Sequence, residues 1–156
     1  MEYTHWFSIA ELTIKLIFKK DGLNNISLLP SFAPFSTNIK EENTLFQLII
    51  DDDLASVTKE LRKHIRTIDT GNGIILVDKL KDGGHQFIIK NIYGKSCSLL
   101  ICNKDYTLWK CALNGNYIMR SFGLNNAIMI AYTFSASKHQ ALMIHASVVR
   151  QNGFAY

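Results

Sequence analysis

Alternating apolar and polar residues predict two strands in the first fifty positions. From Ala10 to Lys20, an apolar row alternates with a polar row, as in a half-buried strand. A second apolar run, Leu45 to Ile50, predicts another strand that ends in three aspartates. The stretch between the two runs contains Pro30 and Pro34, which disfavour both a helix and a central strand.

The segment from Ile65 to Leu113 has the pattern of a β-meander. Four strand-length runs rich in β-branched and aromatic residues are separated by turns containing glycine, asparagine or aspartate: IILVDKL, HQFIIKN, SCSLLIC and YTLWKCAL. Turns spaced about every ten residues are typical of antiparallel sheet. The preceding stretch, Leu54 to Ile65, has helix-forming residues but only a short apolar stripe, so a short helix and a strand both remain open.

A helix and a hairpin are expected after the meander. Residues 119–138 carry an apolar stripe at helical spacing, and Gly123 would weaken a helix interior, so we expect the firm helix to start near Leu124. Residues 142–149 then alternate as a strand, and Asn152-Gly153 favours a type I′ turn. The return strand, Phe154 to Tyr156, would complete a terminal hairpin.

These elements define the expected fold class. The chain should be α+β, mainly an antiparallel β-meander with one long helix in its C-terminal half and a terminal β-hairpin. We expect a β-rich domain over residues 1–140, followed by a strand-turn-strand segment over residues 141–156. A length of 156 residues fits one domain, or one domain with an appendage.

Composition and charge narrow the classes of partner. The chain is 47% hydrophobic and 19% charged, which is typical of a packed protein, and its net charge is +4. The basic residues gather only in KELRKHIR at residues 59–66, for which we expect a solvated helical face or loop rather than nucleic-acid binding. The N-terminus lacks the pattern of a signal peptide, and the longest apolar run, Ala127 to Tyr132, is too short to span a bilayer. We therefore expect a cytoplasmic protein without a membrane or nucleic-acid partner.

Residues that could carry chemistry are few. Cys97, Cys102 and Cys111 are expected to be reduced core thiols, and a separation of five puts the first two on opposite faces of a strand. Neither histidines nor cysteines have metal-ligand spacing, so no metal site is expected. The run of aspartates at residues 51–53 lacks the calcium-loop pattern and should solvate a strand end. The glycine pairs at 71–73 and 82–84 predict hairpin turns, because neither belongs to a GxxxxGK[ST] string.

His145 is the one polar residue that stands out. It lies on a strand of otherwise apolar and small residues, two positions before Ser147 on the same face. A histidine bonded to a backbone group explains this placement. Nucleophilic catalysis would also need an orienting acid and an oxyanion hole, so the residues alone indicate no enzyme.

The C-terminal segment resembles a known family. HASVVRQNGFAY is similar to the strand, turn and strand that lead into the P-loop of HPr kinase-like proteins, which are related in fold to phosphoenolpyruvate carboxykinases. In that group the next residues form GxSGxGKS[TS], and this chain ends a few residues earlier. The LLPSFAPF loop, the meander with its DGG turn and GLNNAIMIAYTF also resemble the N-terminal regions of bacterial members.

The resemblance implies a non-catalytic part of a larger enzyme. Members are proposed ATP-dependent phosphotransferases whose nucleotide, magnesium and catalytic acids belong to residues beyond this chain. It therefore implies no catalytic, cofactor-binding or metal-binding residue here, with ATP and magnesium expected only in the complete protein. His145 alone carries over, as a residue close to the phosphate region of that complete protein.

Three functions follow as expectations. The first is an N-terminal accessory or assembly domain of an HPr kinase-like phosphotransferase, with the missing C-terminal kinase half as its partner. The alternative is a free-standing β-rich module that binds a ligand or protein between meander and helix. A third is a small enzyme that pairs His145 with Asp78 or Asp105. Because a truncated hairpin would expose a strand edge, we also expect a homo-oligomer formed through the C-terminal hairpin.

Overall fold

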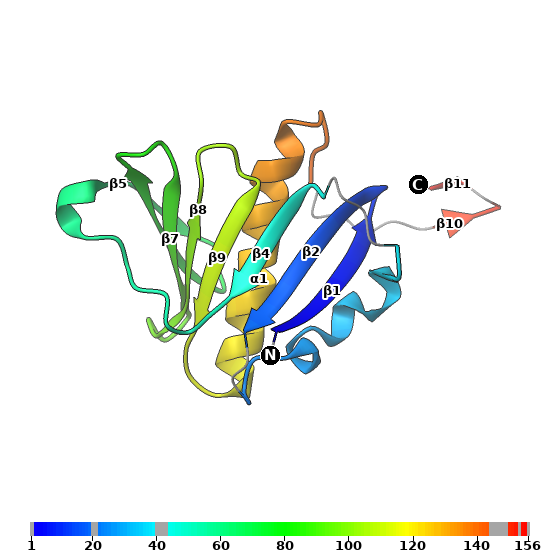
Figure 1. The fold of residues 1–156 in the computed structure, drawn as a ribbon, viewed down its shortest axis with the longest axis horizontal. Coiled ribbons are helices and arrows are strands. Elements are labelled where there is room, and N and C mark those ends of the chain that lie inside the picture. The colour runs from blue at the N-terminus through cyan, green and yellow to red at the C-terminus, as the bar shows by residue number, and fades with distance from the viewer. Residues whose placement is uncertain (1, 20–21, 40–43, 144–149, 153, 156) are drawn as a thin grey trace.

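The computed structural model describes residues 2–19, 22–39, 44–143, 150–152 and 154–155 (Figure 1). A nine-stranded, mostly antiparallel sheet carries one long helix on one face, so the predicted α+β class is confirmed. The strands of the large sheet are β1 (Glu2–Ile9), β2 (Leu12–Lys19), β3 (Ser36–Thr37), β4 (Phe46–Ile50), β5 (Arg62–Asp69), β6 (Gly73–Leu80), β7 (His85–Asn91), β8 (Ser96–Cys102) and β9 (Leu108–Leu113). The helix α1 spans Tyr117–Ser137, and short 3₁₀ helices span Ile26–Leu28, Pro30–Phe35 and Lys59–Leu61.

The order of strands explains how the meander is placed. Along the sheet the order is β3-β1-β2-β4-β9-β8-β7-β6-β5, and only β2–β4 and β4–β9 are parallel pairs. After β4 the chain crosses to the far edge of the sheet, forms β5 there, and returns strand by strand to β9 beside β4. The predicted meander is therefore confirmed, and β5 is its outermost strand (Figure 1).

Two expectations near the N-terminus need correction. The strand predicted from Ala10 begins at Leu12, because Ala10 and Glu11 both have positive φ and turn the chain back from β1. This pair is not a typical turn sequence, so the turn between β1 and β2 was not recognised from the sequence. The proline-containing loop forms 3₁₀ turns, with Pro30 at the first helical position, so the expectation of no helix was wrong for this tighter type.

The helix starts at Tyr117, two residues before the predicted segment 119–138 and about two turns before Leu124, where its firm part was expected. Asn116 caps it, because its side-chain oxygen accepts a hydrogen bond of 3.1 Å from the Met119 backbone N–H. Gly123 lies inside the helix instead of at its start, so that expectation was wrong. A Cβ at this position would stand 2.8 Å from the Cys97 carbonyl oxygen, so glycine allows the helix to lie close to β8.

The core fills the space between α1 and the centre of the sheet. Trp109, Phe46 and Phe87 are almost wholly buried there, against Leu124 and Ile128 of the helix. Farther along the same sheet, Leu28 and Leu29 of the 3₁₀ segment are buried, and the ring of Phe32 packs on Phe7 at 5.7 Å. The three cysteines are free and buried, as expected for core thiols.

The C-terminal hairpin forms a sheet of its own. Strands β10 (Arg150–Gln151) and β11 (Phe154–Ala155) pair antiparallel, and Asn152 between them has a φ of +52°, as the predicted turn requires. Residues 142 and 143 of the expected preceding strand are not in a strand. The remainder of that strand, with His145 and Ser147, lies outside the described residues.

Candidate binding groove and polar network

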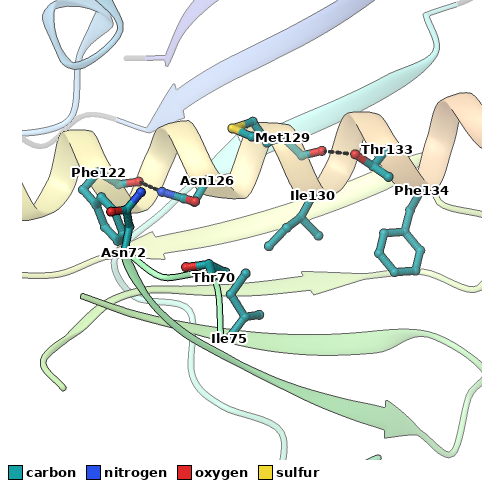
Figure 2. A pocket seen from close by; sticks show the side chains of 9 residues that line it. All are labelled: Thr70, Asn72, Ile75, Phe122, Asn126, Met129, Ile130, Thr133 and Phe134. Carbon is teal, nitrogen blue, oxygen red and sulfur yellow. Dashed lines mark hydrogen bonds between the residues drawn. The ribbon is translucent and has the colours of Figure 1, made fainter. Parts of the chain in front are cut away.

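A groove runs between α1 and the turn that joins β5 to β6. Figure 2 shows Phe122, Asn126 and Ile130 of the helix facing Asn72 and Ile75 across a cavity of about 720 Å³. Its lining is mostly apolar, with amide and hydroxyl groups on both sides, from Thr70 and Asn72 near the turn and from Asn126 and Thr133 of the helix. Such a mixture suits a mainly apolar ligand or side chain with a few polar groups.

A smaller cavity of about 240 Å³ extends the groove beneath β5. Ile75, Ile130 and Phe134 line both cavities, so the two lie side by side. On the strand side the smaller cavity is lined by Ile65 and Ile68, whose side chains are 51% and 39% exposed. The two cavities together are called the α1–β5 groove below.

The groove exists because the helix is narrower than the sheet. α1 packs on β4, β7, β8 and β9, while β5 and β6 extend beyond it. Phe134 closes the helix side of the gap, with ring centroids 5.4 Å from Phe87 and 5.3 Å from Tyr106. Ser135 fixes this wall, because its hydroxyl donates to the Tyr106 carbonyl at 2.6 Å and accepts from Trp109 Nε1 at 3.2 Å. The wall is therefore preformed.

His85 lies at one end of the smaller cavity and is buried. Its ring stacks on Tyr106 with centroids 5.9 Å apart, and Nδ1 is 3.5 Å from the Tyr106 hydroxyl. Burial, and then the positive charge of Lys79, lower the pKa of His85. At neutral pH the imidazole is therefore uncharged, and His85 adds no positive charge to the smaller cavity.

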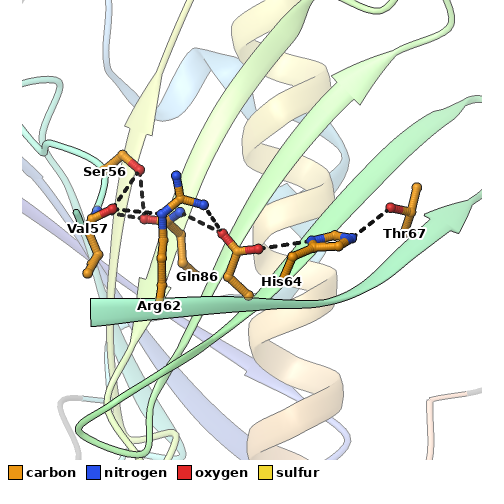
Figure 3. A network of polar contacts seen from close by, with 7 residues as sticks. Ser56, Val57, Arg62, His64, Thr67 and Gln86 are labelled. Atoms are coloured by element: carbon orange, nitrogen blue, oxygen red, sulfur yellow. Dashed lines mark hydrogen bonds and ion pairs between the residues drawn. The ribbon is translucent and has the colours of Figure 1, made fainter. Parts of the chain in front are cut away.

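A buried carboxylate, that of Asp78, lies on the face of β6 that points away from the groove. Asp78 is 3% exposed, next in sequence to the groove residue Val77, and therefore points to the other face of the sheet. His64 Nδ1 lies 3.0 Å from one of the Asp78 oxygens, and Arg62 Nη1 forms an ion pair with the other. Figure 3 shows Arg62 and His64 within this network. Gln86 Nε2 donates to the Asp78 carboxylate at 3.2 Å. Burial raises the pKa of Asp78, but the bonds to His64 and Arg62 outweigh it and leave that pKa below its usual value.

This network ties three segments together. Gln86 accepts hydrogen bonds from the Val57 backbone N–H at 2.8 Å and from the Ser56 hydroxyl at 3.0 Å (Figure 3). Arg62 Nε donates to the Val57 carbonyl at 2.8 Å, so the chain entering β5 is held against β6 and β7. At the other end, His64 Nε2 lies 3.0 Å from the Thr67 hydroxyl. The order carboxylate, imidazole, hydroxyl occurs in hydrolase triads, but every bond here also anchors the edge strand, and we assign the network a structural role.

Several acidic residues that the sequence singled out form ion pairs with basic side chains. Asp51 and Asp52 form ion pairs with Lys19 at 2.6 Å and Arg120 at 2.7 Å. Asp105, one of the two acids considered as partners of His145, is exposed and 3.9 Å from Lys138. The other, Asp78, is the centre of the network above, and His145 itself lies outside the described residues. Among the residues that the structure describes, no three of the histidines, cysteines, aspartates and glutamates gather as metal ligands.

Sequence reasoning missed the groove and misplaced the basic cluster. Residues 62–66, expected on a solvated helical face or loop, belong to the edge strand β5, with Ile65 facing the groove. The available signal was Ile65 within the basic run and Ile68 just after it. No helix in the described part of the chain is long and apolar enough to cross a membrane.

Comparisons of the chain with models of protein families, with curated proteins and with solved structures found no match.

Proposed function

We propose that this chain is the non-catalytic N-terminal accessory domain of an HPr kinase-like ATP-dependent phosphotransferase. The observation that carries the proposal is the paired strands β10 and β11 around Asn152, at φ +52°, within the segment that resembles the approach to the P-loop. They form their own two-stranded sheet instead of extending the nine-stranded one. This supports a division between residues 1–140 and a segment that belongs with a following kinase domain.

In this proposal the chemistry lies outside the chain. The following residues would bind ATP and magnesium, with His145 near the phosphates, in a cytoplasmic enzyme. The domain over residues 1–140 would pack on the kinase half, position its substrate or mediate assembly. Exposed backbone in the terminal hairpin would also favour self-association of the isolated chain.

Calorimetry tests the proposal directly. ATP with magnesium is titrated into this chain and into a version extended by the next hundred or so codons of its gene. We expect heat of binding only for the extended version. If that version binds no nucleotide, or if the gene encodes no further residues, the accessory-domain proposal fails.

Light scattering tests the self-association. The chain should form dimers at high concentration, and a version ending at Gln140 should remain monomeric. A monomer in both cases would contradict assembly through the hairpin but would leave the nucleotide test unaffected.

A free-standing binding module is the second candidate, and the α1–β5 groove favours it. The groove is formed entirely by residues 65–134, so it needs no further domain. The two candidates differ in one observable result, because only the accessory domain predicts that extending the chain creates nucleotide binding.

A further inference from the structure

We propose that the edge of β5, together with the α1–β5 groove, binds an extended acidic polypeptide as an added strand. The proposal concerns residues 59–134 only and holds for either candidate function. It names a partner by its chemistry: an extended backbone, acidic side chains, and apolar side chains at alternate positions.

The first argument is the geometry of the edge. β5 is eight residues long, with an irregularity of the β-bulge type between His64 and Arg66, and it ends the sheet order; among the described residues its one strand partner is β6. The outward backbone N–H and C=O groups of such a strand can pair with a further chain. The opposite edge of the sheet is the two-residue strand β3, which offers far less backbone. β3 pairs with β1 only at Trp6 and Phe7, whereas no described strand lies beside any part of the outer side of β5.

The second argument is the groove beside the edge. Ile65 and Ile68 are large exposed apolar residues that line it. Alternate side chains of an added strand point to the same face, so every second residue of a bound peptide would lie over this hydrophobic wall. The groove thus supplies pockets for side chains in addition to the backbone bonds of the edge.

The third argument is charge. Lys63, His64 and Arg66 are exposed on β5, and Lys59 lies just before it, with Glu60 and Asp69 as the nearby acids. A second copy of the chain fits this edge poorly. In a two-fold antiparallel pair centred on Arg66, that residue would face its own copy, so two positive charges would be opposed. Like charges opposed across strands are destabilising, whereas an acidic strand would be attracted.

The fourth argument is preorganisation. On the face away from the groove, Asp78 binds Arg62 and His64, and His64 binds Thr67. Side chains from both ends of β5 are therefore fixed before any partner arrives. An edge that is already ordered loses less conformational entropy on binding.

Fluorescence anisotropy with labelled synthetic peptides tests the proposal. The probe is an eight-residue peptide of alternating glutamate and valine. Two controls keep its length: one replaces glutamate by lysine, and one carries N-methyl groups on alternate residues, which removes backbone donors. We expect saturable binding of the first peptide alone, weakening as salt is raised.

Matched variants then locate the site. Lys63→Glu and Arg66→Glu together should weaken binding about tenfold, because two attractive charges become repulsive. Ile68→Ser should weaken it by a smaller factor, and the variant should stay folded because Ile68 is an exposed residue. Lys95→Glu makes one such charge reversal in the β7–β8 turn and should leave binding intact. Circular dichroism checks that each variant remains folded.

Several results would overturn the proposal. Equal binding of the lysine peptide or of the N-methylated peptide would exclude an acidic added strand. So would undetectable binding of the acidic peptide at millimolar concentration, or equal loss in the Lys95→Glu variant. Tighter binding of single-stranded DNA, lost in the Lys63→Glu/Arg66→Glu variant, would assign the basic edge to nucleic acid instead.

Discussion

Arg120 Nη1 lies 2.7 Å from Asp52 Oδ2, which joins the first turn of α1 to the chain leaving β4. The same guanidinium donates to Asn24 Oδ1 at 2.8 Å and, through Nε, to the Gly115 carbonyl at 2.9 Å. Asp52 Oδ1 also accepts from the Leu113 backbone N–H at 2.8 Å. This pair therefore connects the helix, the end of β9 and the segment before the 3₁₀ turns.

Asp52→Ala should lower the free energy of unfolding by about 2–3 kcal/mol, because it leaves the nearly buried Arg120 without its charge partner. Urea unfolding followed by circular dichroism measures the change. Asp53→Ala is the control: Asp53 is exposed, and a surface substitution should stay within about 0.5 kcal/mol. A loss in the Asp53 variant as large as in the Asp52 variant would contradict a specific role for the pair.

Gly123→Ala should destabilise the protein by about 1–3 kcal/mol, although alanine is the better helix former. The new methyl group would stand 2.8 Å from the Cys97 carbonyl oxygen and push α1 away from β8. Gly22→Ala serves as the matched control, since nothing lies within 4 Å of a Cβ at that position. Thermal unfolding of both variants measures the difference. Equal melting temperatures would show that the helix can shift without cost.

His85 should make stability depend on pH in the weakly acidic range. Burial and Lys79 lower its pKa in the folded protein, so the unfolded chain takes up a proton at higher pH than the folded one. Stability is then complete above the ordinary histidine pKa of about 6.5 and falls as the pH drops below it. Urea unfolding between pH 5 and 7.5 measures this slope.

His85→Phe should make that slope shallower, since a phenyl ring suits the aromatic surroundings and does not titrate. His5, whose pKa burial also lowers, would account for a residual slope. The exposed His139 gives the control, and His139→Phe should leave the slope as it is. An unchanged slope in the His85 variant would count against the buried neutral imidazole.

The meander was predictable because each of its signals is local. Runs of β-branched residues and turns with glycine or asparagine determine β6 to β9 without reference to the remainder of the chain. The strand β1 and the start of α1 could not be predicted in the same way, because tertiary contacts determine where they begin and end. Ala10 and Glu11 adopt positive φ, which neither residue type favours. Gly123 lies inside the helix because a larger residue there would clash with the Cys97 carbonyl oxygen.

The site was harder to predict than the fold. A groove arises where a helix leaves part of a sheet uncovered. The width of that uncovered part cannot be predicted from any local stretch of sequence. The bond between His64 and Asp78 joins residues on neighbouring strands, so it depends on the register of β5 and β6. The basic run was visible, but it was expected on a solvated helical face or loop, and most of it belongs to the edge strand β5.

The three thiols should be unreactive in the folded protein. Cys97 and Cys111 are fully buried and Cys102 is 3% exposed, and burial raises the pKa of all three, that of Cys102 to about 11. Because the thiolate is the reactive form, an aromatic disulfide reagent at pH 8 should modify none of them within an hour and all of them in denaturant. Ser96→Cys, at an exposed position of the same strand as Cys97, should add one thiol that reacts at once. Rapid reaction of the unchanged protein would show that α1 opens away from the sheet under native conditions.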